Sequence, residues 1–216
     1  MSQIKLKHSG GNGVIIAAPS SNPASDRTIT LPGDADGTLA RTIDVDYVKL
    51  QSANSTVDVS DLTFDSLDVT SYKSFRIIGS VLPATDEVVL YCRLRASGSS
   101  LSSSSYQWKM YGTNAAGNAF TLSSSGEDKA LIANNAGNDT REGMRFDILI
   151  TPRVSGDGFH NNFGFTQGCK YESSTGLEGF NAEFVYNEDS VSDGFTLFHN
   201  SGNVSEYSYC LYGIRR

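Results

Sequence analysis

Short runs of alternating apolar and polar residues, separated by turn residues, make up most of the 216-residue chain. In the run over 71–81, for example, Phe75, Ile77 and Gly79 fall on one face, as the period of two in a strand requires. Such runs recur at a spacing of roughly 8 to 15 residues, with Gly, Pro, Asn, Asp or Ser between them. The pattern predicts an all-β protein, whose residues 46–216 form a two-sheet sandwich or jelly roll.

Residues 1–45 differ from the rest. Three short extended runs, IKLKH, VIIAAP and RTITLP, are divided by the turn SGGNG and the loop PSSNPASD, and the turn GDADG follows them. Strands this short cannot bury much against one another, because a small isolated sheet is marginally stable in water. We therefore predict an extended N-terminal β-arm that assembles with the rest of the chain or with other copies.

A serine-rich segment, SGSSLSSSS (97–105), precedes the aromatic run YQWKMYG (106–112). We expect a solvated loop there, joining the strand over 88–96 to the aromatic run as a hairpin with a long tip. Alternation places Tyr106 and Trp108 on one face of the second strand, and Gln107 and Lys109 on the other.

Composition narrows the classes of partner. The chain carries 17 Lys and Arg against 24 Asp and Glu, a formal net charge of −7. Its cations are scattered, whereas phosphate binding needs clustered positive charge, so we expect no nucleic-acid partner. No apolar run approaches the roughly 18 to 20 residues that span a bilayer, and the first residues lack the apolar stretch of a secretory signal. We therefore expect no membrane insertion.

Cysteine and histidine give no catalytic or metal-binding pattern. The three cysteines, Cys92, Cys169 and Cys210, lie far apart with no CxxC spacing, and we expect buried free thiols from a protein made in a reducing cytoplasm. The three histidines lie outside any nucleophile motif, and we expect them to be solvated. They are His8 in the arm, His160 in a Gly/Asn loop and His199 at a strand end.

Carboxylates occur in turns and on expected solvent faces. Three adjacent pairs fall in turns or loops, where a carboxyl group has no cause for the raised pKa that a glycosidase acid needs. These are Asp86–Glu87, Glu127–Asp128 and Glu188–Asp189. Asp34 and Asp36 begin like a calcium loop, but no Glu follows at its twelfth position, and a second acidic stretch holds Asp58, Asp61, Asp65 and Asp68. We predict no enzyme activity, no cofactor and no metal site, with a weak calcium site as the open alternative.

Aromatic residues are the best candidates for surface contact. Tyr106, Trp108 and Tyr111 follow the serine-rich segment, while Phe159 and His160 lie in the loop SGDGFHNNF (155–163). Packing in the core is one interpretation of the Tyr/Trp cluster. A subunit interface or a sugar-stacking face is the other, because exposed Trp and Tyr suit recognition. The loops 97–105 and 155–163 are the candidate contact tips.

The segment IKLKHSGGNGVIIAAPSSNPASDRTITLPGDADGTLA resembles the N-terminal segment of tail-fibre and other virion structural proteins of bacteriophages, especially cyanophages. The GGNG turn, the PSSNP loop and the TITLPGDADGTL run carry the resemblance over most of residues 3–40. Residues 71–98 and 194–216 are similar to strand–turn–strand units in the β-sandwich domains of phage appendages. The resemblance implies a virion component, often trimeric, with no fixed catalytic site.

Three classes of function remain at this stage. The leading one is a structural virion protein, a tail-fibre or appendage subunit assembled in the host bacterial cytoplasm, whose arm attaches to neighbours and whose sandwich projects toward the host surface. Its expected partners are copies of itself, as a trimer, and other tail or capsid proteins. A capsid-decorating or head-fibre protein is a close variant. The second class is a glycan-binding module that contacts host surface polysaccharide, and a hydrolase ranks last.

Overall fold

The computed structural model describes residues 3–7, 10, 13–17, 46–139, 141–153, 161–173 and 176–216. The chain divides into two compact units, Met1–Ala40 and Arg41–Arg216. In the first unit, β1 (Gln3–Lys7) and β2 (Gly13–Ala17) form an antiparallel two-stranded sheet. They are two of the three strands expected in the arm. The third, RTITLP, lies outside the described residues.

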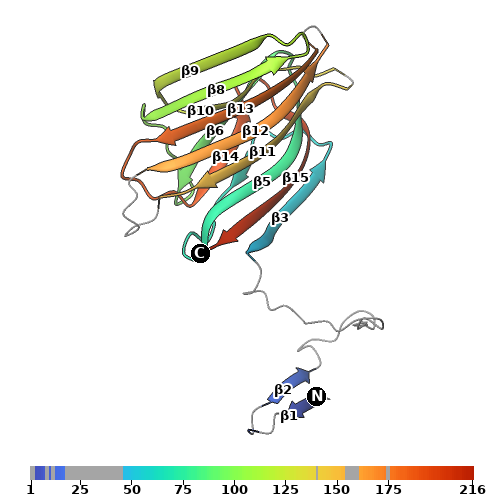
Figure 1. Cartoon of the computed structure of the whole chain (residues 1–216), viewed down its shortest axis with the longest axis vertical. Helices are drawn as coiled ribbons and strands as arrows, with labels where there is room; N and C mark the ends of the chain where they lie inside the picture. Colours follow the sequence, from blue (N-terminus) through green and yellow to red (C-terminus); the bar gives the residue numbers. More distant parts are fainter. Residues whose placement is uncertain are drawn as a thin grey trace. The chain divides into compact units, whose positions relative to one another are not determined.

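The second unit is a β-sandwich of two antiparallel sheets, as the alternating pattern predicts, and no helix occurs among the described residues. Figure 1 shows the eight strands of the larger sheet side by side, in the order β3-β15-β5-β11-β12-β13-β8-β9. Their bounds are β3 Tyr47–Ser55, β5 Tyr72–Pro83, β8 Tyr106–Asn114, β9 Ala119–Glu127, β11 Gly143–Thr151, β12 Asn162–Glu172, β13 Gly176–Tyr186 and β15 Val204–Arg215. The smaller sheet has the order β10-β6-β14-β4, and β7 pairs with β6. Its strands are β4 Leu62–Phe64, β6 Val88–Ala96, β7 Ser99–Ser100, β10 Ala130–Ala136 and β14 Gly194–His199.

One apolar core lies between the two sheets. Phe75, Ile77 and Ile148 point inward from the larger sheet, and Leu90 and Leu94 face them from the smaller one. All five side chains are almost completely buried. The expectation that Phe75 and Ile77 share a face is confirmed. Burying side chains of this size stabilises the fold by roughly 1.5 to 3 kcal/mol each.

The serine-rich segment does not join two strands of one hairpin, so that expectation was wrong. Ser99–Ser100 (β7) folds back onto β6, and the N–H of Leu101 donates to the carbonyl of Leu94 (2.8 Å). The chain then crosses to the larger sheet, where β8 pairs with β13 and β9. Tyr106 stabilises this crossing, because its buried hydroxyl donates to the Leu101 carbonyl and accepts the N–H of Leu94, both at 2.9 Å.

Glycines face aromatic rings across four strand pairs of the larger sheet. The pairs are Gly164–Phe184, Gly168–Phe180, Gly112–Phe120 and Gly79–Tyr209. A Cβ atom at Gly164 would lie 2.0 Å from the ring of Phe184, so the ring occupies the space that a side chain of β12 would fill. The inner face of β12 therefore carries little apolar bulk, and its aromatic residues lie on the outer face.

A buried ion pair lies on the inner face near one end of β12. Lys170 Nζ is 3.1 Å from Glu178 Oε2 on β13, and it donates to the backbone carbonyl of Asn135 on β10 at 2.7 Å. The side chains of Lys170 and Glu178 are 1% and 13% exposed. The pair lies opposite in register, so it links β12 and β13 on the inner face and ties both to the smaller sheet.

Candidate functional site

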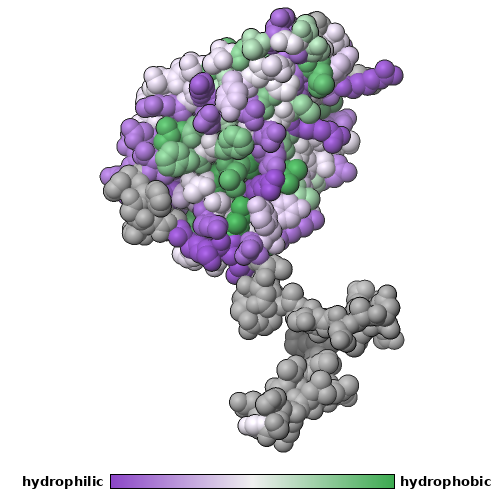
Figure 2. Space-filling model, viewed as in Figure 1, coloured by the Kyte–Doolittle hydropathy of each residue, from purple (hydrophilic) through white to green (hydrophobic). Residues whose placement is uncertain are grey.

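The outer face of the larger sheet carries most of the exposed aromatic residues. Phe163 and Phe165 on β12 are 48% and 43% exposed, and Tyr111 on β8 is 39% exposed. In Figure 2 this face shows apolar side chains gathered near its middle among polar ones. Solvent exposure of several large apolar side chains on one face marks a candidate contact surface.

A row of mostly small side chains crosses this face from one edge of the sheet to the other. The strand register places each member directly opposite the next. In order from β3 to β9 the row is Asn54, Ser208, Ser80, Arg145, Cys169, Gly179, Thr113 and Ala119. Because its neighbours on the same face are larger, this row forms the floor of a groove, which we call the transverse trough.

Two further rows form the walls of the transverse trough. On one side lie Asp147, Gln167, Asn181 and Tyr111, again opposite one another in register. On the other side lie Tyr171 and Leu177. Three adjoining depressions of about 660, 490 and 490 Å³ follow the trough. The first two share Ser80, Arg145, Cys169 and Ser208, and the last two share Gln167 and Gly168.

A fourth depression, of about 650 Å³, lies beside the trough rather than in it. Phe163, Phe165 and Leu149 line it, together with Lys109 and Glu183. Lys109 and Glu183 are opposite in register, and the ammonium group of Lys109 lies 5.9 Å from the centre of the Tyr111 ring. Apolar and charged groups therefore alternate over this part of the face.

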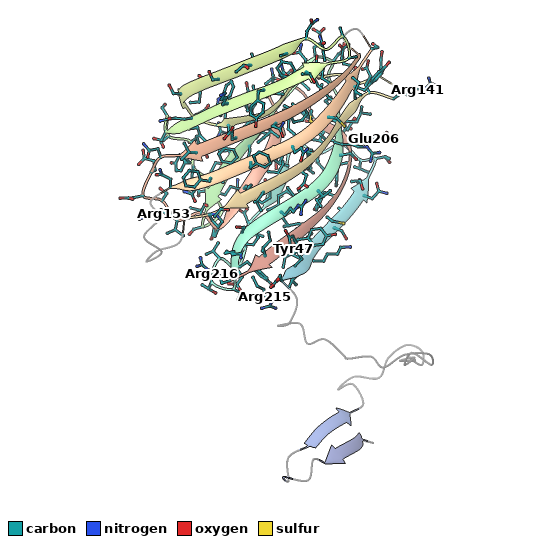
Figure 3. All side chains as sticks on the ribbon, in the orientation of Figure 1. Tyr47, Arg141, Arg153, Glu206, Arg215 and Arg216 are labelled. Carbon is teal, nitrogen blue, oxygen red and sulfur yellow. The ribbon has the colours of Figure 1, made fainter. Side chains whose placement is uncertain are left out.

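The charges on the face differ in whether they are paired. Arg76 on β5 donates to both carboxylate oxygens of Asp147, at 2.8 and 2.5 Å, and this hydrogen bonding raises the pKa of Arg76 above its ordinary value. The guanidinium group of Arg145, in the floor of the trough, has no hydrogen bond, ion pair or ring contact with any described residue, and neither has that of Arg141. Because it has no such partner, Arg145 is a cation available to a ligand in the trough. Figure 3 shows Arg141 and Glu206 toward one end of the strands and Tyr47 toward the other.

The structure separates the five side chains predicted for surface contact. Tyr106 is fully buried in the core, which rules it out as a surface residue, and Trp108 is half-buried against the same core. Tyr111 is exposed and lies in the wall of the trough. Phe159 and His160 lie outside the described residues. The predicted alternation along β8 is confirmed, because Gln107 and Lys109 face solvent.

Neither the strand β12 nor Arg145 was predicted from the sequence to belong to a functional site. The residues of β12, NFGFTQGCKYE, alternate strictly, and the usual interpretation would place its aromatic rings in the core. Two glycines could have shown that these rings face solvent instead. Gly164 and Gly168 each lie two residues from Thr166, and all three residues share one face of the strand. Glycines that alternate with aromatic residues indicate a face that receives rings from a neighbouring strand.

The predicted carboxylate pairs mostly hold loops together. Asp128 pairs with Arg93 and Lys129, and these contacts lower its pKa, with the Lys129 hydrogen bond as the largest cause. Glu188 accepts a hydrogen bond from Ser105 (2.5 Å), and Asp189 pairs with Arg153 (3.2 Å). These carboxylates are engaged by donors or cations, which is the environment of a structural carboxylate rather than of a general acid.

The acidic stretch over 58–68 is likewise used within the fold. Asp65 pairs with Arg95 at 2.6 Å. Asp68 Oδ1 accepts the N–H groups of Thr70 and Ser71, both at 3.0 Å, and hydrogen bonds from these two residues lower its pKa. Among the described residues, no group of three or more His, Cys, Asp or Glu side chains is placed to hold a metal ion. Asp34 and Asp36 lie outside the described residues. No helix in the described part of the chain is long and apolar enough to cross a membrane.

The cysteines are free, but only one of them is buried as expected. Cys92 lies in the core, where burial raises its pKa. Cys210 is half-buried, and Cys169 is exposed on the floor of the trough. The prediction for Cys169 was wrong because Cys169 lies on the outer face of β12, where the larger side chains of this strand also lie.

His199 is buried rather than solvated, which corrects the expectation from its position at a strand end. It lies opposite Leu90 on the inner face of the smaller sheet and is 6% exposed. Among the residues that the structure describes, neither ring nitrogen has a hydrogen-bond partner. The backbone N–H and C=O of nearby Val89 are both bonded to Asn200 instead, at 2.8 and 3.1 Å. Burial lowers the pKa of His199 to about 4, so its ring is neutral at pH 7.

This burial predicts a loss of stability in mild acid. An unfolded histidine takes up a proton near pH 6.5, whereas His199 in the fold does so near pH 4, so the unfolded state binds more protons between these values. Stability is therefore full above pH 6.5 and falls as the pH is lowered toward 4, by about 2 kcal/mol at pH 5. Urea unfolding at pH 7 and pH 5 measures the loss. A His199→Leu variant should lack this component, and equal losses in both proteins would contradict the prediction.

Comparisons of the chain with protein-family models, with curated proteins and with solved structures find no match. The function of the chain is therefore inferred from its residues and from the geometry described above.

Proposed function

We propose that the protein is a structural component of a virion, a tail-fibre or appendage subunit that attaches through its N-terminal arm and presents its sandwich outward. The observation that carries this proposal is the division of the chain into two units, the first of which contains a two-stranded sheet. Such a sheet buries too little surface to be stable by itself, so it suits assembly with a partner. The resemblance of residues 3–40 to the N-terminal segment of phage fibre proteins supports the same function.

Assembly through the arm joins copies by pairing of strand edges and burial of apolar surface. The edges of β1 and β2 that are not paired with each other offer backbone groups to a neighbouring chain. We propose a trimer that forms in the cytoplasm of a host bacterium, and the free cysteines suit that reducing compartment. The net charge of −7 keeps unassembled copies apart in solution. A capsid-decorating or head-fibre protein would use the same arm, and is the alternative within this proposal.

The proposed function is binding and assembly, without catalysis. Asp128 and Asp189 form ion pairs, and Glu127 and Glu188 accept hydrogen bonds from Ser124 and Ser105, so these carboxylates hold loops in place. Neither His199 nor the buried thiol of Cys92 is accessible to a substrate.

The mass of the protein in solution tests the assembly step. We expect the full chain to run as a trimer in size-exclusion chromatography with light scattering, and a chain without residues 1–45 to run as a monomer. Immunogold electron microscopy of virions, with antibody against the sandwich, then distinguishes tail from capsid. A monomeric full chain, or the absence of gold from intact particles that a positive control labels, would contradict the proposal.

A further inference from the structure

We propose that the transverse trough binds a linear polysaccharide chain laid across the strands of the larger sheet. This inference concerns the sandwich alone, and it does not depend on the assignment of the protein to a virion. It is carried by the shape of the trough, by the polar groups along it and by the one unpaired cation in its floor.

The shape of the trough suits an extended polymer. Its floor crosses eight strands, a span of about 34 Å at the usual spacing of about 4.8 Å between strands. The depressions along it share lining residues, so the groove is continuous. A small molecule prefers an enclosed pocket that covers most of its surface, whereas a long shallow groove offers repeated contacts to a chain of repeating units.

The polar side chains of the trough match a ligand that is rich in hydroxyl groups. Gln167 and Asn181 lie opposite each other in the wall, and neither side-chain amide has a hydrogen-bond partner among the described residues. Each amide offers two donors and one acceptor, and the hydroxyl groups of Ser80, Ser208 and Thr113 offer both functions in the floor. Sugar hydroxyls also donate and accept, so one sugar ring satisfies several of these groups at once.

Aromatic rings lie on both sides of these polar groups. Tyr111 belongs to one wall and Tyr171, which is 45% exposed, to the other. The face of an aromatic ring packs against the C–H groups of a sugar while its hydroxyl remains available for a hydrogen bond. Exposed rings beside unpartnered amides therefore provide the two kinds of contact that a pyranose ring offers.

Arg145 defines the centre of the site. Its guanidinium group has five donors and no partner in the described part of the chain, whereas Arg76, on the adjacent strand β5 and the same face, is occupied by Asp147. Arg145 lies opposite Ser80 on one side and Cys169 on the other. It can donate to vicinal hydroxyl groups of a neutral sugar or, bidentately, to the carboxylate of a uronic acid.

The same observations disfavour other occupants. A peptide needs partners for its backbone groups, but the backbone N–H and C=O groups of the interior strands are already used in the sheet. The centre of an interface between two copies of the sandwich is usually apolar. On this face, rows of polar residues separate the apolar residues Phe163 and Phe165 from Tyr171 and Leu177. Nucleic acid is disfavoured because Arg145 is the one cation in the row that forms the floor, whereas phosphate backbones are bound by clustered Lys and Arg.

The exposed thiol of Cys169 provides a direct test, because it lies in the floor beside Arg145. In the full chain carrying Cys210→Ser, N-ethylmaleimide should modify Cys169, and mass spectrometry follows the rate. The two probes are a soluble linear glucan and polygalacturonate. We expect one or both to slow the modification about tenfold at a concentration ten times that which half-saturates the site. A rate that depends on protein concentration without polymer would show that a second copy covers the trough, and would overturn the proposal.

Matched variants distinguish the trough from the rest of the face. Gln167→Ala and Tyr111→Ala should each weaken the affinity for the polymer about fivefold, since each removes an interaction of about 1 kcal/mol. Phe163→Ala, on the same strand and face but outside the trough, should leave protection unchanged. Arg145→Gln should weaken binding of polygalacturonate more than binding of the glucan, because the Gln amide still donates to hydroxyl groups but carries no charge for a carboxylate. Protection by neither polymer, or protection that the trough variants do not change, overturns the proposal, and neither result bears on arm-dependent assembly.

Discussion

A Glu178→Gln substitution is expected to lower the free energy of unfolding by about 3 to 5 kcal/mol, the usual penalty for leaving a buried charge without its partner. Lys170 is 1% exposed, and its ammonium group contacts Glu178 Oε2 (3.1 Å) and the Asn135 carbonyl (2.7 Å). Without the Glu178 carboxylate, the buried ammonium group loses its ion-pair partner on β13, and a neutral amide does not balance its charge. Urea denaturation of the two proteins at pH 7, followed by circular dichroism, measures the difference.

Two variants make this prediction specific. Glu183→Gln removes a carboxylate from the same strand, but from its exposed face, and should change stability by no more than about 0.5 kcal/mol. The double variant Lys170→Met/Glu178→Leu removes both charges and should recover most of the loss, because a buried ion pair contributes little beyond the apolar residues that replace it. If Glu178→Gln and Glu183→Gln have equal effects, the buried pair is not what stabilises this end of the sheet.

The buried pair also bears on the proposed binding site. Lys170 and Glu178 lie opposite each other on the inner face, and the next residues along the two strands, Tyr171 and Leu177, lie opposite on the outer face and form one wall of the trough. Because side chains alternate, a shift of one residue between β12 and β13 would turn one strand over and move its wall residue to the core. The same shift would carry one charge of the ion pair to the outer face and leave the other buried without its partner, so the ion pair opposes it.

The all-β sandwich could be predicted from the sequence because period-two alternation depends only on neighbouring residues. The exchange between sheets after β7 could not, because it depends on Tyr106, whose hydroxyl bonds to the backbone of β6 and of the loop that follows β7. A buried tyrosine and an exposed one look alike in a short aromatic run. In the same way, the local sequence does not distinguish a buried histidine from a solvated one, and we therefore expected His199 to be solvated.

The trough could not be predicted for a different reason. Its floor is drawn from eight strands, and its members become neighbours only through the register of pairs such as Arg145–Cys169 and Gly179–Thr113. Nothing in the local sequence of these residues distinguishes them from ordinary solvent-facing positions. Tyr111 was identified because it belongs to an aromatic cluster, which is visible locally. A surface assembled across strands thus becomes apparent only when strand order and register are known.

Gly168→Ala is expected to lower the free energy of unfolding by about 3 kcal/mol, the upper range for inserting a methyl group into a packed core. The new Cβ would lie 2.5 Å from the carbonyl oxygen of Arg145 and 2.5 Å from the ring of Phe180. The carbonyl belongs to the neighbouring strand β11 and cannot move without breaking the sheet, and Phe180 is 2% exposed in the core. Thermal and urea unfolding measure the change.

Gly179→Ala is the matched control, because it adds the same methyl group to the neighbouring strand on the opposite face. No atom lies within 4 Å of the Cβ that it would introduce. We expect stability to be unchanged or to rise by up to about 1 kcal/mol, since alanine restricts the unfolded chain more than glycine does. Gly179 also lies in the floor of the trough, so its methyl group should weaken polysaccharide binding while the fold stays intact. Equal destabilisation by the two substitutions would show that strand glycines matter here for backbone freedom, and not for the space that Phe180 and its counterparts occupy.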